Sequence, residues 1–315
     1  MSISVEMVEV GPRDGLQNEK TLVSTDDKLA FIRRAIAAGS KRIEIASFVH
    51  PKLVPQMADA EDVVRELGEV EGVTRIGLTL NKRGALRAFD AGVDQLGAVC
   101  VATDGFGLKN QNQTSAQTVQ TANEIVKLAY AEGRTAQVTI STAFGCPFDG
   151  EVAETRVLEI VKQLVDARPC EIALADTIGV GVPAQVSSLV RKTADIIAPI
   201  PVRVHFHNTR NMAIANVWAA IEAGATVIDS SIGGIGGCPF APAATGNVAT
   251  EDVIYLLNRS GVEHGLELDE LIETAKWLET ILGAKVPSML AAAGGFGEGG
   301  LGIFLRFTRG LKRPK

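Results

Sequence analysis

The sequence predicts a closed (β/α)₈ barrel, in which eight parallel strands alternate with helices. Short runs rich in Val, Ile and Leu recur about every 30 residues along the 315-residue chain, and longer segments with helical periodicity lie between them. Eight such alternations favour a closed barrel over an open, doubly wound sheet. The first strand is followed by GPRDGLQ and not by G-x-G-x-x-G, so a dinucleotide-binding sheet is poorly supported.

Each strand is predicted from a short apolar run and each helix from an apolar stripe at helical spacing. The expected strands are 5–10, 42–47, 75–80, 95–102, 137–144, 171–176, 202–207 and 226–232. The expected helices are 26–38, 57–68, 83–91 (a weaker pattern), 114–132, 152–167, 184–197 and 211–223. Four glycines stand where a helix needs a left-handed residue at its C-terminal end: Gly39, Gly92, Gly133 and Gly224.

The end of the chain differs from the alternating pattern. Residues after about 265 read as helices appended to the barrel, and no convincing linker precedes them. We therefore expect a catalytic barrel over 1–264 and a C-terminal helical extension over 265–315 that packs on the barrel, where it could cover the barrel mouth.

Composition and charge exclude several classes of protein. Hydrophobic residues make up 46% of the chain and charged residues 22%, which allows a sizeable core. The net charge is −6 and no basic stripe is present, so we expect no nucleic-acid partner. No apolar run approaches a membrane span and no signal-peptide pattern opens the chain. The four cysteines show no C-x-x-C spacing, which is typical of reduced thiols, and we expect a cytoplasmic protein.

Two of the four histidines lie on one predicted strand. Side chains alternate along a strand, so His205 and His207 share a face. Asp14 follows the first strand, which lies near the last strands in a closed barrel. Two imidazoles with carboxylate and amide oxygens suit a divalent cation such as Mg²⁺ or Mn²⁺, and Zn²⁺ is an alternative. The competing interpretations are histidines that only pack in the core and a turn residue for Asp14 in PRDG.

Acidic residues on the apolar strands are further candidates, because unpaired buried carboxylates are costly. Glu44 alternates with Ile43 and Ile45 and should face the barrel interior, as catalyst, support or partner of a nearby arginine. By the same argument Glu9 should face the interior. Asp176 ends the sixth strand, at the end of the barrel where active sites are built.

The stretch 233–247 combines glycines with a cysteine. Four glycines within five residues indicate a bent or mobile loop, followed by Cys238 and Pro239. Such a thiol suits acid–base work better than a buried one does, and Cys146 is a second candidate. Asn247 precedes a predicted helix, VATEDVIYLLN, and its alternative role is the N-cap of that helix.

Six motifs, in order over roughly residues 5–260, resemble the 3-hydroxy-3-methylglutaryl-CoA lyase family. They are VEVGPRDGLQNEK (8–20), SFVHPKLVPQM (47–57), FGCPFDGEV (144–152), ADTIGVGVP (175–183), HFHNTR (205–210) and GGIGGCPFAPAATGNVATED (233–252). The resemblance implies a metal-dependent (β/α)₈ enzyme that splits an acyl-CoA ester into acetyl-CoA and acetoacetate.

The resemblance also assigns roles to residues. It implies that the divalent-metal ligands are Asp14, His205, His207 and Asn247. It implies that Arg13 stabilises an enolate, that Cys238 is the acid on the loop, and that Glu44 and Asp176 are acidic support residues. Lys20 and Gln17 fall where the family approaches the CoA and the metal. We also expect a homo-oligomer.

The chain departs from the family pattern at several positions, and all of them except Asn208 are expected near the acyl pocket. Thr103-Asp104, Thr139 and Ala173 replace residues common in the family, and Asn208 replaces an aspartate after the second histidine. The acyl group is therefore open: 3-hydroxy-3-methylglutaryl-CoA is the leading expectation and citramalyl-CoA the alternative. A synthase related to the isopropylmalate and citramalate synthases, and a barrel that binds CoA esters without turnover, are the other hypotheses.

Overall fold

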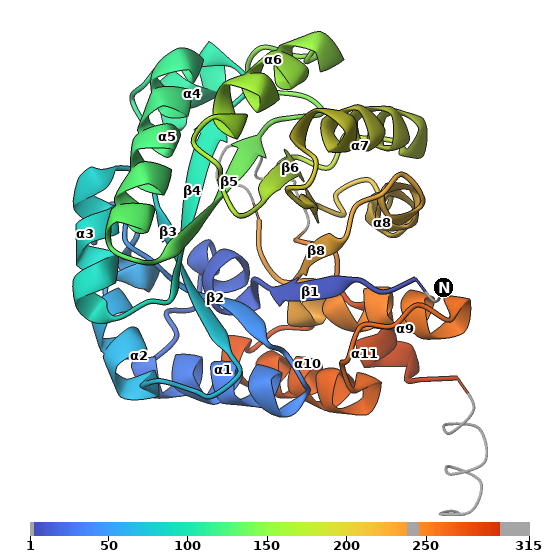
Figure 1. Ribbon diagram of the computed structural model, residues 1–315. Coiled ribbons are helices and arrows are strands. Elements are labelled where there is room, and N and C mark those ends of the chain that lie inside the picture. Colours follow the sequence, from blue (N-terminus) through green and yellow to red (C-terminus); the bar gives the residue numbers. More distant parts are fainter. Residues whose placement is uncertain (1–2, 238–245, 297–315) are drawn as a thin grey trace, which may run out of the picture.

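The computed structural model shows a (β/α)₈ barrel with additional C-terminal helices (Figure 1). It describes residues 3–237 and 246–296. In these ranges the strands form one closed parallel barrel in sequence order, and β1 pairs with β8. The strands are β1 (Glu6–Glu9), β2 (Arg42–Ser47), β3 (Thr74–Thr79), β4 (Gln95–Val101), β5 (Thr135–Ser141), β6 (Ile172–Asp176), β7 (Val202–Phe206) and β8 (Val227–Ser230).

Helices surround the barrel (Figure 1). They are α1 (Thr25–Ala37), α2 (Ala60–Leu67), α3 (Lys82–Ala91), α4 (Asp104–Asn110), α5 (Ser115–Ala131), α6 (Glu154–Val165), α7 (Pro183–Ile197), α8 (Ala213–Glu222), α9 (Thr250–Ser260), α10 (Leu268–Leu282) and α11 (Met289–Ala293). Three shorter turns are η1 (Gly11–Gly15), η2 (Pro55–Met57) and η3 (Ile232–Gly234). All predicted strands and helices are confirmed, with ends that shift by a few residues, whereas α4 was not predicted.

Local sequence explains where several helices start and stop. The Ser24 side chain accepts a hydrogen bond from the Asp27 backbone N–H at the start of α1, and Thr114 and Gln117 form a reciprocal cap at the start of α5. At the end of α3, Gly92 has φ +99°, a left-handed conformation that glycine adopts without steric cost.

The barrel interior shows which face of β1 points inward. Val8, Val10, Ile76 and Val227 form one buried cluster. They come from β1 and the residue after it, from β3 and from β8, and β1 and β3 are not neighbours, so these side chains meet inside the barrel. Glu9 must then point outward, because successive residues of a strand alternate. The expectation that Glu9 faces the interior was wrong, since it assumed that its valine neighbours faced the helices.

The outward Glu9 carboxylate ties β1 to the segments that follow β8. It accepts hydrogen bonds from the backbone N–H groups of Gly11 (2.8 Å) and Ile232 (3.0 Å) and from the Thr250 hydroxyl (2.7 Å). Burial raises its pKa to about 8, although these three donors act in the opposite direction. Glu9 therefore connects η1, η3 and α9 beneath the mouth of the barrel.

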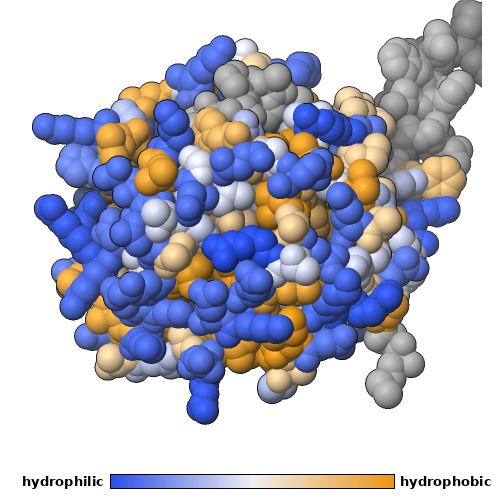
Figure 2. All heavy atoms as spheres, turned by 90° about the horizontal axis from the view of Figure 1, so that it is seen from above, coloured by the Kyte–Doolittle hydropathy of each residue, from blue (hydrophilic) through white to orange (hydrophobic). Residues whose placement is uncertain are grey.

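The C-terminal helices pack on the side of the barrel. α10 packs against α1, α9 and η3, and α11 packs against α9 and α10. The division into domains at residue 264 stays a prediction. Across the part of the chain that the structure describes, no helix is both long and apolar enough to cross a membrane. On the face shown in Figure 2, hydrophobic side chains are scattered among hydrophilic ones.

Candidate active site

A cavity of about 150 Å³ opens at the C-terminal ends of the strands. This is the end at which (β/α)₈ enzymes build their active sites. Its apolar lining residues include Leu78, Leu80, Val99 and Phe106. Its polar lining residues are Arg13, Asp14, Gln17, Asn18, Glu44, Asn110, Gln137, Thr139, Ser141, Thr177, Arg203, His205, His207 and Asp229.

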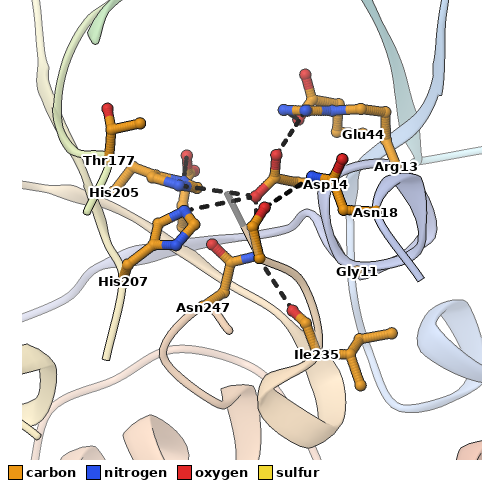
Figure 3. A network of polar contacts seen from close by, with 12 residues as sticks. Gly11, Arg13, Asp14, Asn18, Glu44, Thr177, His205, His207, Ile235 and Asn247 are labelled. Carbon is orange, nitrogen blue, oxygen red and sulfur yellow. Dashed lines mark hydrogen bonds and ion pairs between the residues drawn. The ribbon is translucent and has the colours of Figure 1, made fainter. Parts of the chain in front are cut away.

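Three of the predicted metal ligands form a compact group in this cavity (Figure 3). The Nε2 atoms of His205 and His207 lie 3.8 Å and 3.9 Å from Oδ2 of Asp14. Asn247, the fourth predicted ligand, donates from Nδ2 to the same Asp14 oxygen at 2.8 Å and to the Ile235 carbonyl at 3.2 Å. Residues from η1, from β7 and the residue after it, and from the segment before α9 thus meet at one point.

The donor set fits a divalent cation. One carboxylate, two imidazoles and one amide supply hard and borderline ligands of the kind that Mg²⁺, Mn²⁺ and Zn²⁺ accept. Two buried atoms of this group, Nδ1 of His207 and Oδ1 of Asn247, have no hydrogen-bond partner. Turning the Asn247 amide by 180° would direct its oxygen at Asp14, an arrangement that a cation between the two oxygens would stabilise.

Asn247 does not cap the helix that follows it. The N-cap of α9 is Ala249, which makes no side-chain capping bond. The alternative interpretation of Asn247 as an N-cap was therefore wrong. Its side chain is buried beside Asp14, and its Oδ1 has no hydrogen-bond partner, which is costly in a buried position unless a ligand completes it.

The electrostatics keep Asp14 and His207 in the protonation states that metal ligands need. Burial tends to raise the pKa of Asp14, but Arg13 and the two histidines outweigh burial and lower it. Burial and the neighbouring His205 lower the pKa of His207 to about 4, so its imidazole is neutral at physiological pH. The pKa of His205 is raised, because Asp229 and Asp14 outweigh its burial.

Arg13 links the group to Glu44. Its Nη1 lies 2.6 Å from Asp14 Oδ1 and its Nη2 lies 2.7 Å from Glu44 Oε2. Glu44 faces the barrel interior, as its alternation with Ile43 and Ile45 predicted. Nε of Arg13 is buried and has no hydrogen-bond partner, so a donor remains for a ligand.

The other predicted site residues lie at different distances from the cavity. Gln17 lines it, whereas Lys20 is exposed and does not. The Asp176 carboxylate accepts hydrogen bonds from the backbone N–H groups of Val180 (2.9 Å) and Gly181 (2.8 Å) and does not line the cavity. Burial raises the pKa of Asp176. Its part in the reaction stays a prediction.

Cys238 lies outside the residues that the structure describes, but both flanks of its loop are described. Gly237 lines the cavity, and its carbonyl accepts a hydrogen bond from Asn18 Nδ2 at 2.7 Å. A Cβ on Gly246 would lie 1.9 Å from the Gly234 carbonyl oxygen, so only glycine permits this close approach. Cys146, the second candidate, is buried against Thr103 and does not line the cavity.

Sequence reasoning missed two charged residues of the site, Arg203 and Asp229. Both line the cavity, and Asp229 Oδ2 lies 3.2 Å from His205 Nδ1. Alternation could have revealed them, because Arg203 shares the face of His205 on β7 and an aspartate interrupts the apolar β8. Of the positions expected near the acyl pocket, Thr139 lines the cavity, whereas Thr103 and Ala173 do not.

The fold and the cluster together define a (β/α)₈-barrel protein with a candidate divalent-metal centre at the mouth of the barrel. A profile of the HMGL-like family matches residues 4–278. The chain is 41% identical over 301 residues to (R)-citramalyl-CoA lyase of Chloroflexus aurantiacus, which covers 92% of this chain and 95% of that protein. It is 39% identical over 289 residues to the human cytoplasmic 3-hydroxy-3-methylglutaryl-CoA lyase, and the match covers 92% of this chain and 78% of that protein.

A solved structure shows the same architecture. The structure of an HMG-CoA lyase from A. baumannii, in complex with coenzyme A and 3-methylmalate, superposes with a TM-score of 0.90 at 39% identity and covers 94% of this chain and 96% of that one. The chain belongs to the HMGL-like family of acyl-CoA lyases. The predicted resemblance is confirmed.

Proposed function

We propose that this protein cleaves 3-hydroxy-3-methylglutaryl-CoA to acetyl-CoA and acetoacetate with the help of a divalent cation, Mg²⁺ or Mn²⁺. The observation that carries the proposal is the meeting of Asp14, His205 and His207 with Arg13 in one cavity. Family membership and the relatives' names support the reaction class. The complex of the A. baumannii relative with coenzyme A supports an acyl-CoA as the ligand.

The reaction makes three demands on the site. The substrate hydroxyl must lose a proton, the thioester must accept the electrons of the breaking carbon–carbon bond, and the resulting enolate carbon must gain a proton. A cation held by Asp14, His205, His207 and Asn247 would supply Lewis acidity toward the hydroxyl and carboxylate oxygens of the substrate. The protein's own side chains would do the rest.

Arg13 is the proposed electrostatic partner of the thioester oxygen. Its guanidinium is fixed by Asp14 and Glu44, and its buried Nε is available as a donor. A positioned cation of this kind stabilises developing negative charge by a few kcal/mol because it needs no reorganisation during the reaction. Glu44 is therefore a residue that orients Arg13.

The proton transfers are assigned to Asp176 and Cys238. Asp176 does not line the cavity, so it would take the hydroxyl proton through an intervening water, and its burial raises its pKa, which makes it a better base than an exposed aspartate. Cys238 follows Gly237, a residue of the cavity wall, and is proposed to protonate the enolate carbon. Two further residues are proposed to approach the CoA ester: Gln17, which lines the cavity, and Lys20, three residues further along the chain.

Citramalyl-CoA is the second candidate substrate, because the relative at 41% identity is a citramalyl-CoA lyase. The two esters share a 3-hydroxy-3-methyl thioester and a carboxylate, and they differ by one methylene. A pocket discriminates a single methylene by only about 1–3 kcal/mol, so the shared catalytic groups do not decide between them.

A substrate panel tests the proposal. The protein, loaded with Mg²⁺, is incubated with each ester, and acetyl-CoA, acetoacetate and pyruvate are quantified. We expect the higher kcat/KM with 3-hydroxy-3-methylglutaryl-CoA; a hundredfold preference for citramalyl-CoA would transfer the assignment to that ester. Release of free CoA from acetyl-CoA and a 2-oxo acid would indicate a synthase, and absence of acetyl-CoA under all conditions would indicate a binding protein.

A further inference from the structure

The two histidines of the cluster differ in what holds their second ring nitrogen. Nδ1 of His205 lies 3.2 Å from Oδ2 of Asp229. Nδ1 of His207 is buried and has no hydrogen-bond partner. The Nε2 atoms of both rings lie at nearly the same distance from Asp14. Only one imidazole of the pair is therefore held from behind by a carboxylate.

Asp229 is itself fixed on its other oxygen. Nε of Arg203 donates to Oδ1 of Asp229 at 2.5 Å, and both side chains are almost completely buried, at 1% and 5% exposure. Nη1 of Arg203 lies 3.6 Å from Glu171, which also pairs with Arg42. A row of alternating charges thus runs through the barrel from Arg42 to the cluster and ends on His205.

The two oxygens of Asp229 contact different side chains, which indicates that this carboxylate does more than neutralise Arg203. Arg203 already has Glu171 as an anionic neighbour on its other side. Oδ1 of Asp229 accepts from Arg203, and Oδ2 faces the imidazole of His205. An anionic acceptor at Nδ1 favours the tautomer with the proton on Nδ1, which leaves the lone pair of Nε2 directed at Asp14.

We propose that Asp229 is a positioning residue that fixes the tautomer and the ring orientation of His205 for divalent-cation binding, while His207 binds without such a partner. The proposal rests on the proposed metal site and goes beyond it, because it makes the two histidines unequal. Carboxylates behind metal-binding histidines typically account for 10–100-fold in metal affinity.

Direct metal titration tests the proposal without an activity assay. The metal-stripped protein is titrated with Mn²⁺, and the free ion is followed by electron paramagnetic resonance. We expect Asp229→Asn to weaken Mn²⁺ binding about 10–100-fold. The matched control is Glu171→Gln, which removes the other anion beside Arg203 at similar burial but contacts no histidine. Glu171→Gln should lower Tm and leave the affinity for Mn²⁺ within about twofold of wild type.

The outcomes separate this proposal from the proposed metal site. Wild-type affinity in a folded Asp229→Asn protein, or equal losses of affinity in both variants, would overturn the role of Asp229 and leave the metal site standing. A wild-type protein that binds no Mn²⁺ would overturn both.

Histidine NMR provides a test that needs no change at Asp229. The chain has four histidines, so the ¹⁵N spectrum of the Mg²⁺-loaded wild-type protein is simple, and His205→Gln identifies the signal. We expect the proton of His205 on Nδ1 and an unprotonated Nε2. A proton on Nε2 of His205 in the loaded protein would overturn the proposal even if Asp229→Asn fails to fold.

Discussion

At the scale of single residues, the cluster explains why two of the four histidines share a strand. His205 and His207 both direct Nε2 at Asp14, so the two rings present a nitrogen to one point, as the proposed cation site requires. We expect His205→Asn and His207→Asn each to lower turnover by more than about 100-fold, because even changes behind a ligand cost 10–100-fold. Turnover with saturating Mg²⁺ measures the effect, and circular dichroism confirms the fold. Full activity of the wild-type protein after chelation would refute the metal assignment.

Cys238 allows a second prediction at the same scale. The change Cys238→Ser keeps the size of the side chain but raises its pKa by several units, so delivery of a proton becomes much harder. We expect turnover to fall roughly 10²–10⁴-fold with little change in apparent substrate affinity. Alkylation should inactivate the wild-type protein, and bound substrate should protect it.

The control for Cys238 is another cysteine of the chain. Cys170 is partly buried at the start of β6, outside the cavity wall, and burial raises its pKa to about 11. Cys170→Ser should leave turnover nearly unchanged. Normal turnover of Cys238→Ser together with loss in Cys146→Ser would show that the acid had been assigned to the wrong thiol.

At the scale of elements, the sequence predicted strands and helices well and their orientation less well. Apolar runs and stripes located each strand, because burial in the barrel imposes those patterns. α4 was missed because Gly105 and Gly107 lower its helix propensity by about 1 kcal/mol each. Glycine is needed at position 107, since a Cβ there would lie 2.5 Å from the Gln113 carbonyl oxygen, whereas a Cβ on Gly105 would meet only the side chain of Asp149.

The predicted inward orientation of Glu9 was wrong for a related reason. In a barrel strand both faces are buried, one by the interior and one by helices, so alternation does not reveal which is which. Only the contacts of Val8 and Val10 with β3 and β8 decide it. Glu44 was assigned correctly because its neighbours Ile43 and Ile45 pack into the main core instead.

Glu9 leads to a prediction on stability. Its pKa in the folded protein is about 8, above the ordinary value of 4.5, so the folded state holds a proton that the unfolded state has lost between these values. Stability should therefore fall as pH rises from about 5 to 8, with a slope of at most about 1.4 kcal/mol per pH unit from this group.

The variant Glu9→Gln removes this dependence, because its amide can accept from Gly11 and Ile232 and donate to Thr250. Urea unfolding at several pH values measures the effect. We expect the free energy of unfolding of Glu9→Gln to decline less than that of wild type between pH 5 and 8. Parallel curves for the two proteins would contradict the raised pKa.

At the scale of the whole molecule, the barrel explains how residues 233 positions apart in the chain come to share one site. Parallel pairing of β1 with β8 brings the turn after β1 next to the segment after β8, and Asp14 meets Asn247 there. The closed barrel was predictable from the eight strand–helix alternations, and so was the proximity of Asp14 to the two histidines. The salt-bridge row behind His205 was not, because Arg203 lies on β7, Asp229 on β8 and Glu171 just before β6, and the sequence does not show the register of these strands.

Because the cluster draws on β7 and on the turns that follow β1 and β8, cation binding should stabilise the entire fold. A ligand that binds only the folded state at 100 times its Kd adds about 2.7 kcal/mol to the free energy of unfolding. For a chain of 315 residues that corresponds to a rise in Tm of roughly 4 °C. We expect Mg²⁺ or Mn²⁺ to raise the Tm of the metal-stripped wild-type protein and to leave that of Asp14→Asn unchanged, as measured by calorimetry. An equal rise in both proteins would place the cation away from Asp14, His205 and His207, since the site would then not depend on the carboxylate that both imidazoles face.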